Sequence, residues 1–190
     1  TITGHAAVCN RDSEDLGWFI EQVAPGAFTR SIKAAKDHPV DDMIHAFWNH
    51  DSGQVLSSTR NGKLTLEEDA TGLRFAFPSS RLTPAQLEAV TDGDMRMSFG
   101  FMTKKDEWTH GGPGQPDRRK LLDVDLLEIS PVSKPAYPQT TVMARENPDA
   151  AYAVRSHEVW AATLAPEKKT EVAVPLQVYQ DRLTAIRATL

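Results

Sequence analysis

Residues 95–103 read MRMSFGFMT, so large apolar side chains alternate with small or polar ones. Because the side chains of a strand point alternately to its two faces, this spacing predicts a half-buried β-strand. One face would be apolar, and the other would carry Arg96, Ser98 and Gly100. On that second face, a small hydroxyl beside a residue without a side chain leaves room for a substrate backbone.

Two helices are predicted before this strand. Phe28, Ile32 and Ala35 recur at helical spacing. That helix should stop before His38-Pro39, because the residue preceding a proline avoids the helical conformation. Residues 83–86, Thr-Pro-Ala-Gln, match a capping box with proline at the first helical position, which predicts the start of a second helix.

Apolar runs and turn residues predict further strands at residues 43–49, 55–60, 63–68, 73–77 and 121–129. Asn61-Gly62 separates two of these runs and is the pair that best tolerates the positive φ angles of a type I′ turn. The runs on either side of it are therefore expected to form a β-hairpin. The Gly- and Pro-rich residues 110–116 predict a surface loop.

Residues 1–145 thus predict one strand-rich α+β domain, and residues 146–190 a helical C-terminal extension. The end of the extension carries a short heptad-like seam with spacings of three and four, made of Leu176, Tyr179, Leu183, Ile186 and Leu190. Such a seam must bury against the domain or against another subunit, so we expect self-association.

Charge and composition narrow the function classes. The net charge of −5 at pH 7, without any basic stripe, argues against nucleic-acid binding. No apolar run approaches the roughly 18 residues that a membrane-spanning helix needs. The single cysteine, Cys9, excludes an intrachain disulfide and fits a reducing compartment. We therefore expect a soluble cytosolic protein that binds neither nucleic acid nor membranes.

Two residues are candidates for hydrolytic chemistry. Ser98 could be a nucleophile, although a serine on a half-buried strand is usually structural. His50 follows the apolar run 43–49 and, on a continuing strand, would share the face of Trp48. An apolar wall there could tune the imidazole as a general base, whereas most histidines at strand ends are surface or packing residues.

Glu128 is a third candidate because it continues a period-2 apolar stripe made of Leu122, Val124 and Leu126. A carboxylate on such a stripe needs a partner. Either the strand ends there and the carboxylate is solvated, or it orients a histidine, as the third member of a serine triad does.

Other site chemistries have weaker support. A metal-dependent hydrolase could use His45, His50 and Asp51, but two histidines five residues apart on a strand face opposite ways. Lys104 could pair with Ser98, although nothing else supports that arrangement. The chain has no Gly-rich phosphate loop and no paired-cysteine motif. We therefore expect neither a cofactor nor a metal.

Several short motifs resemble, in order, those of the prohead (capsid-maturation) serine protease family of tailed bacteriophages. They span roughly residues 4–145 and read GHAAV at 4–8, EQVAPGAF at 21–28, WNHD at 48–51, MSFGF at 97–101, EISPV at 128–132 and PAYP at 135–138. Each motif is weak alone, and their order and spacing carry the resemblance. One departure is Val55-Leu56-Ser57, where the family usually has Gly-x-Leu.

The resemblance implies a fold similar to that of the herpesvirus assemblin proteases, a mostly antiparallel β-barrel with surrounding helices. It implies Ser98 as the nucleophile and His50 as the base. Glu128 falls where the third catalytic residue is expected. The extension beyond Arg145 lies outside the resemblance.

The implied function is that of a serine endopeptidase in phage procapsid maturation. Its substrates would be segments of the major capsid protein or the scaffold, and the protease itself. It would act in the host cytoplasm, inside the assembling procapsid. The alternative is a non-catalytic scaffold or assembly module that retains the protease fold.

Overall fold

This computed structural model of the chain describes residues 1–144. Within that range the chain is α+β and consists mainly of strands, as the sequence predicts. The predicted helical extension, residues 146–190, lies outside the described residues. In the described part, no helix is long and apolar enough to cross a lipid bilayer.

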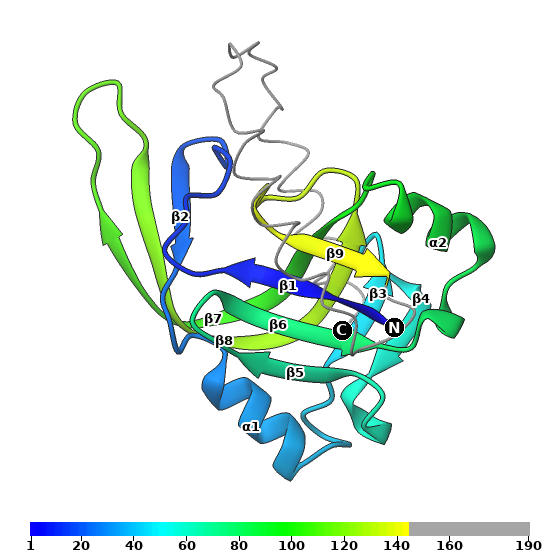
Figure 1. The fold of residues 1–190 in the computed structure, drawn as a ribbon. Coiled ribbons are helices and arrows are strands. Elements are labelled where there is room, and N and C mark those ends of the chain that lie inside the picture. Colours follow the sequence, from blue (N-terminus) through cyan, green and yellow to red (C-terminus); the bar gives the residue numbers. More distant parts are fainter. Residues whose placement is uncertain (145–190) are drawn as a thin grey trace. The chain divides into compact units, whose positions relative to one another are not determined.

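One sheet has four strands, and all its pairings are antiparallel. Its strand order is β5-β6-β1-β9, with β1 Ile2–Val8, β5 Thr65–Glu68, β6 Gly72–Phe77 and β9 Thr141–Ala144. Figure 1 shows this sheet lying across the long strands of the second sheet.

The second sheet has five strands arranged around the longest one, β8 (Asp117–Val132). The antiparallel partner β7 (Arg96–Thr109) runs along one edge of β8, and residues 110–116 link the two strands. On the other edge, β2 (Phe19–Val23) and β3 (His45–Trp48) pair with β8 in parallel. The outer edge of β3 pairs with β4 (Asp51–Ser58).

The predicted barrel is not confirmed. Through residue 144, the strands form two separately hydrogen-bonded sheets and no closed barrel. The predicted predominance of antiparallel pairing is confirmed, since only the β2–β8 and β3–β8 pairs are parallel among the strands of residues 1–144.

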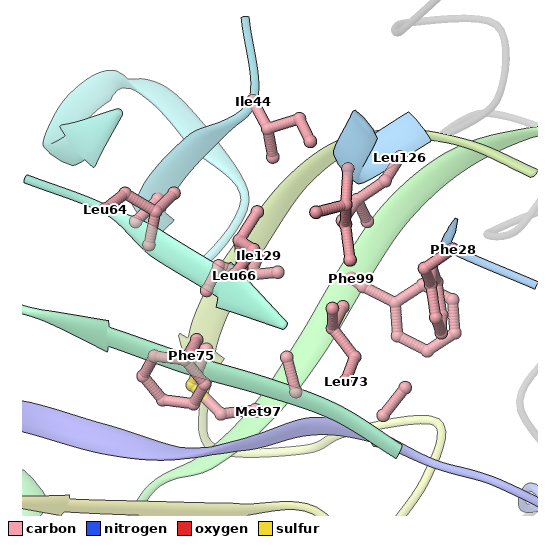
Figure 2. Close-up of a cluster of buried hydrophobic side chains, with 14 of the residues drawn as sticks. Phe28, Ile44, Leu64, Leu66, Leu73, Phe75, Met97, Phe99, Leu126 and Ile129 are labelled. Atoms are coloured by element: carbon pink, nitrogen blue, oxygen red, sulfur yellow. The ribbon is translucent and has the colours of Figure 1, made fainter. Parts of the chain in front are cut away.

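The core lies between the two sheets. In Figure 2, Leu66 and Phe75 of the first sheet approach Met97 and Ile129 of the second. These side chains are almost inaccessible to solvent. Burial of each such side chain stabilises the fold by about 1.5–3 kcal/mol. Since Met97 and Ile129 flank the catalytic candidates along β7 and β8, the core fixes the strands that carry the site.

Both predicted helices are present. The first, α1 (Thr29–Asp37), buries Ile32 and Ala35 and contacts β8. The second, α2 (Pro84–Thr91), begins with the predicted capping box. The Thr83 hydroxyl accepts from the Gln86 N–H, and the Gln86 side chain accepts from the Thr83 N–H.

The predicted hairpin around Asn61-Gly62 is wrong. Residues 59–61 form a short 3₁₀ turn, and only Gly62 of the pair has a positive φ, 69°. A type I′ turn needs positive φ at both central residues. The chain instead crosses here from β4 in one sheet to β5 in the other.

Candidate active site

His50 lies in a tight turn rather than on a strand. Trp48 pairs with Asp51, which leaves Asn49 and His50 as the two turn residues. Their φ angles are 53° and 60°, the pattern of a type I′ turn. Asn and His are among the side chains that tolerate this backbone best. The prediction that His50 shares the strand face of Trp48 is therefore wrong, because the chain reverses first.

Two hydrogen bonds hold this turn against β8. The N–H of Asn49 donates to the carbonyl oxygen of Pro131 at 3.0 Å. The N–H of His50 donates to Oγ of Ser130 at 3.2 Å. Since 42% of the His50 side chain is exposed, the ring remains accessible from solvent while its backbone is fixed.

A β-bulge turns Glu128 toward this histidine. Gly100 pairs with Glu128 and Phe101 with Leu126, so β8 contains one extra residue, Leu127, at this point. An extra residue reverses the alternation of the side chains that follow it. Glu128 therefore lies on the face of Gly100, and the prediction that it continues the stripe of Leu126 is wrong.

Glu128 is buried, with only 8% of its surface exposed, because β8 continues as far as Val132. The solvated alternative is thereby excluded. Its Oε1 lies 2.6 Å from Nδ1 of His50, and its Oε2 accepts a hydrogen bond from the Ser130 hydroxyl at 2.6 Å. Both oxygens of the carboxylate thus have partners.

The contact between His50 and Glu128 fixes where the imidazole carries its hydrogen. An ionised carboxylate can only accept hydrogen bonds, so Nδ1 is the protonated nitrogen. In the neutral ring, Nε2 then carries a lone pair and can take up a proton. This is the tautomer that a general base of the serine-protease type requires.

Ser98 shares the face of this pair. It lies directly opposite Ser130 in the β7–β8 pairing, as Gly100 lies opposite Glu128. Residues directly opposite each other in antiparallel strands have Cβ atoms about 4.5–5.5 Å apart on one face. The predicted grouping of Ser98 and Gly100, away from buried Met97 and Phe99, is confirmed.

Ser98 is half-buried, and its hydroxyl makes no hydrogen bond to any residue from 1 to 144. Its bond with His50 is therefore not formed in this state. Hydrogen bonds between a nucleophile and its base often tighten only when substrate binds.

The space beside Gly100 differs from the sequence expectation. A Cβ on Gly100 would lie 2.5 Å from Oε1 of Glu128. The missing side chain therefore makes room for the carboxylate that holds His50, and not for a substrate backbone.

The alternative site residues do not converge. His45 stacks on Phe47 at 5.0 Å, and burial lowers the pKa of its imidazole, partly offset by the charge of Glu128. Asp51 accepts hydrogen bonds from Gly53 and Gln54 within its own strand. Throughout residues 1–144, His, Cys, Asp and Glu form no group of three that could hold a metal.

Lys104, the alternative partner for Ser98, forms an ion pair with Asp125 at 2.7 Å. That ion pair favours a structural role for Lys104 over a role as the base for Ser98.

Sequence reasoning missed the part played by Ser130 and Asn49. Glu128 and Ser130 are two apart, which places both on one face of a strand. That spacing could have pointed to Ser130 as a partner of the carboxylate. Asn49 precedes His50, and Asn tolerates positive φ, but only the pairing of β3 with β4 shows that the turn falls there.

The comparisons with known proteins identify the family. The sequence model described as caudovirus prohead serine protease matches residues 1–153, which include Ser98, His50 and Glu128. No curated protein and no solved structure matches the chain. With most of its length matched, the chain belongs to the caudovirus prohead serine protease family.

Proposed function

We propose that this protein is a serine endopeptidase in which Ser98 is the nucleophile, His50 the base and Glu128 the residue that orients the base. The observation that carries the proposal is the 2.6 Å contact between Nδ1 of His50 and Oε1 of Glu128 on the face of Ser98. Membership of a serine protease family supports the same chemistry.

The reaction would proceed in two acyl transfers. His50 Nε2 accepts the Ser98 hydroxyl proton as Oγ attacks the peptide carbonyl carbon. The C–N bond then breaks, and the protonated imidazole gives its proton to the leaving amine. Water next attacks the acyl-enzyme ester, again with His50 as base, and releases a carboxylic acid and free Ser98. Glu128 stays ionised and stabilises the imidazolium that forms in each step.

The substrates would be segments of the major capsid protein or of the scaffold, together with the protease itself. The family supports this, since it is described as caudovirus prohead serine protease. The site of action would then be the interior of the assembling procapsid in the host cytoplasm.

A cleavage assay tests the proposal. Purified protein is incubated with a capsid–scaffold substrate, and the parent is compared with Ser98→Ala. We expect the substitution to lower kcat by a factor on the order of 10⁴ or more. Ser80→Ala, which removes an exposed hydroxyl outside the site, is the matched control and should retain full activity. Equal cleavage by the parent and Ser98→Ala would refute the assignment of Ser98 as the nucleophile.

A non-catalytic assembly module is the second candidate. Within residues 1–144, Ser98 and His50 form no hydrogen bond with each other, which is compatible with such a module and equally with a protease before substrate binds. For such a module, a serine-directed fluorophosphonate should leave Ser98 unlabelled even in assembled, correctly oligomeric samples.

Self-association through the C-terminal seam, Leu176 to Leu190, is a further part of the proposal. The apolar spacing in the sequence supports it. A concentration series by sedimentation, with and without residues 170–190, should show a larger species only for the full chain. The same oligomer in both samples would contradict this role.

A further inference from the structure

Ser130 lies at the centre of the candidate site, although neither the family match nor the proposed triad gives it a role. It is completely buried on β8, directly opposite Ser98. It is two residues beyond Glu128, so the two side chains share a face of the strand. Its hydroxyl therefore lies on the face of the sheet that carries the nucleophile and the carboxylate.

The hydrogen-bond directions at Ser130 follow from its partners. A carboxylate only accepts, so the hydroxyl donates its proton to Oε2 of Glu128 at 2.6 Å. A backbone N–H only donates, so the same oxygen accepts from His50 at 3.2 Å. A hydroxyl has one donor and two acceptor positions, so both bonds can form at once.

These two bonds act on both members of the base pair. The bond to Oε2 fixes the rotation of the carboxylate, which directs Oε1 at His50 Nδ1. The bond from the His50 N–H holds the backbone of a residue whose φ of 60° is uncommon for a side chain of this size. The position of His50 and the position of its acceptor, Glu128, thus both depend on one buried atom, Oγ of Ser130.

We propose that Ser130 is a positioning residue, which aligns the His50 imidazole with Ser98 by holding His50 and Glu128 through a single hydroxyl. This inference rests on the proposed serine-protease function. A positioning role differs from a purely structural one. A structural buried serine only needs partners for its own hydroxyl, whereas a positioning residue also sets the geometry of His50 and Glu128.

Ser13 offers a matched control. It is also buried, and its hydroxyl likewise donates one bond and accepts one, to the carbonyl oxygen of Glu14 at 2.7 Å and from the N–H of Glu21 at 2.8 Å. None of its partners belongs to the triad. Ser13→Ala and Ser130→Ala therefore remove the same kind of buried hydroxyl at two places.

The experiment measures kcat, KM and thermal stability for the parent, Ser130→Ala and Ser13→Ala. We expect kcat of Ser130→Ala to fall on the order of 10–100-fold, with KM little changed, because misplacement of a reacting group costs rate and not substrate affinity. Ser13→Ala should keep the parental kcat at a comparable loss of Tm. Ser130→Ala with parental kcat, or equal loss of kcat in both variants, would overturn the proposal.

A proton NMR measurement separates this inference from the proposed function. The hydrogen on Nδ1 of His50, donated to Glu128, should give a downfield resonance in the parent and in Ser13→Ala. In Ser130→Ala this resonance should shift, or disappear because the proton exchanges rapidly with water. If the resonance changes in Ser130→Ala but the parent protein cleaves no substrate, the positioning of His50 by Ser130 is supported and the proposed peptidase function is refuted. If both the resonance and kcat of Ser130→Ala equal those of the parent, the positioning role is refuted and the proposed peptidase function is not.

Discussion

The Glu128 carboxylate divides its oxygens between the His50 ring and the Ser130 hydroxyl. The spacing of this residue in the sequence left open whether it was solvated or paired. His50 comes from a turn that lies far away in the chain, so no local pattern could identify it as a partner, whereas Ser130 is only two residues from Glu128. At this scale the sequence indicated the type of chemistry, and tertiary pairing supplied the contacts.

Glu128→Gln should keep the shape of the site but reverse the hydrogen bond to His50. An amide can donate to Nδ1, which favours the tautomer with its proton on Nε2, and that ring cannot accept the Ser98 proton. We expect kcat to fall by a factor of about 10²–10⁴, by analogy with the serine-protease triad. Steady-state cleavage kinetics measure this.

Glu107→Gln is the control for that substitution, since Glu107 is an exposed carboxylate on β7. It should leave kcat unchanged. If both variants matched the parent, Glu128 would have no orienting role.

The Cys9 thiol provides a pH prediction away from the site. Burial raises its pKa to about 11, with smaller contributions from the negative charges of Glu68 and Asp69. At pH 8 the reactive thiolate should therefore be roughly 100-fold scarcer than for a thiol with the ordinary pKa. We expect slow alkylation by iodoacetamide at pH 8, which accelerates as pH rises toward the pKa. Mass spectrometry follows the adduct, and alkylation at pH 8 as fast as that of free glutathione would contradict the shift.

At the scale of elements, the β7–β8 pairing decides which side chains reach the site. Alternation in residues 95–103 predicted the buried and open faces of β7, and the structure confirms them. The bulge at Leu127 was not predictable, because it is a property of two paired strands and not of either sequence alone. The same reasoning explains the hairpin turn, which falls at Asn49-His50 and not at Asn61-Gly62.

Gly100→Ala tests this pairing. The added methyl would lie 2.5 Å from Glu128 Oε1, so the carboxylate must shift from the position in which it contacts His50. We expect kcat to fall at least about 10-fold, because the base loses its orientation. Cleavage kinetics and the Nδ1 proton resonance of His50 both report the change.

Gly112→Ala is the matched control for Gly100→Ala. A Cβ on Gly112 meets no atom within 4 Å, so this variant should cleave like the parent. Parental kcat together with an unshifted His50 resonance in Gly100→Ala would contradict the packing argument.

The capping box of α2 could be predicted in full, because a cap depends only on residues within one turn. Thr83→Ala should lower the free energy of unfolding by about 1 kcal/mol, while Thr83→Ser should retain most of it. Denaturant unfolding followed by circular dichroism measures both. A Thr83→Ala variant as stable as the parent would show that α2 is held by packing alone.

For the whole molecule, apolar runs and turn residues predicted the strand-rich α+β domain, and helical spacing and a capping box predicted the two helices found within residues 1–144. They could not predict that β4 and β5, neighbours in the chain, belong to different sheets, since that division depends on long-range pairing. The predicted barrel followed from the family resemblance and not from any residue pattern. The site lies in the five-stranded sheet, where a turn, a bulge and a glycine bring His50 and Glu128 together.

The central claim is that Ser98 is a nucleophile activated by His50 and Glu128. Fluorophosphonate labelling followed by peptide mass spectrometry tests it most directly, with the parent compared against His50→Ala. The account predicts one adduct, on Ser98, in the parent, and labelling at least about 100-fold slower in His50→Ala. Labelling of Ser98 at the same rate in both proteins, or an adduct on another serine, would contradict it.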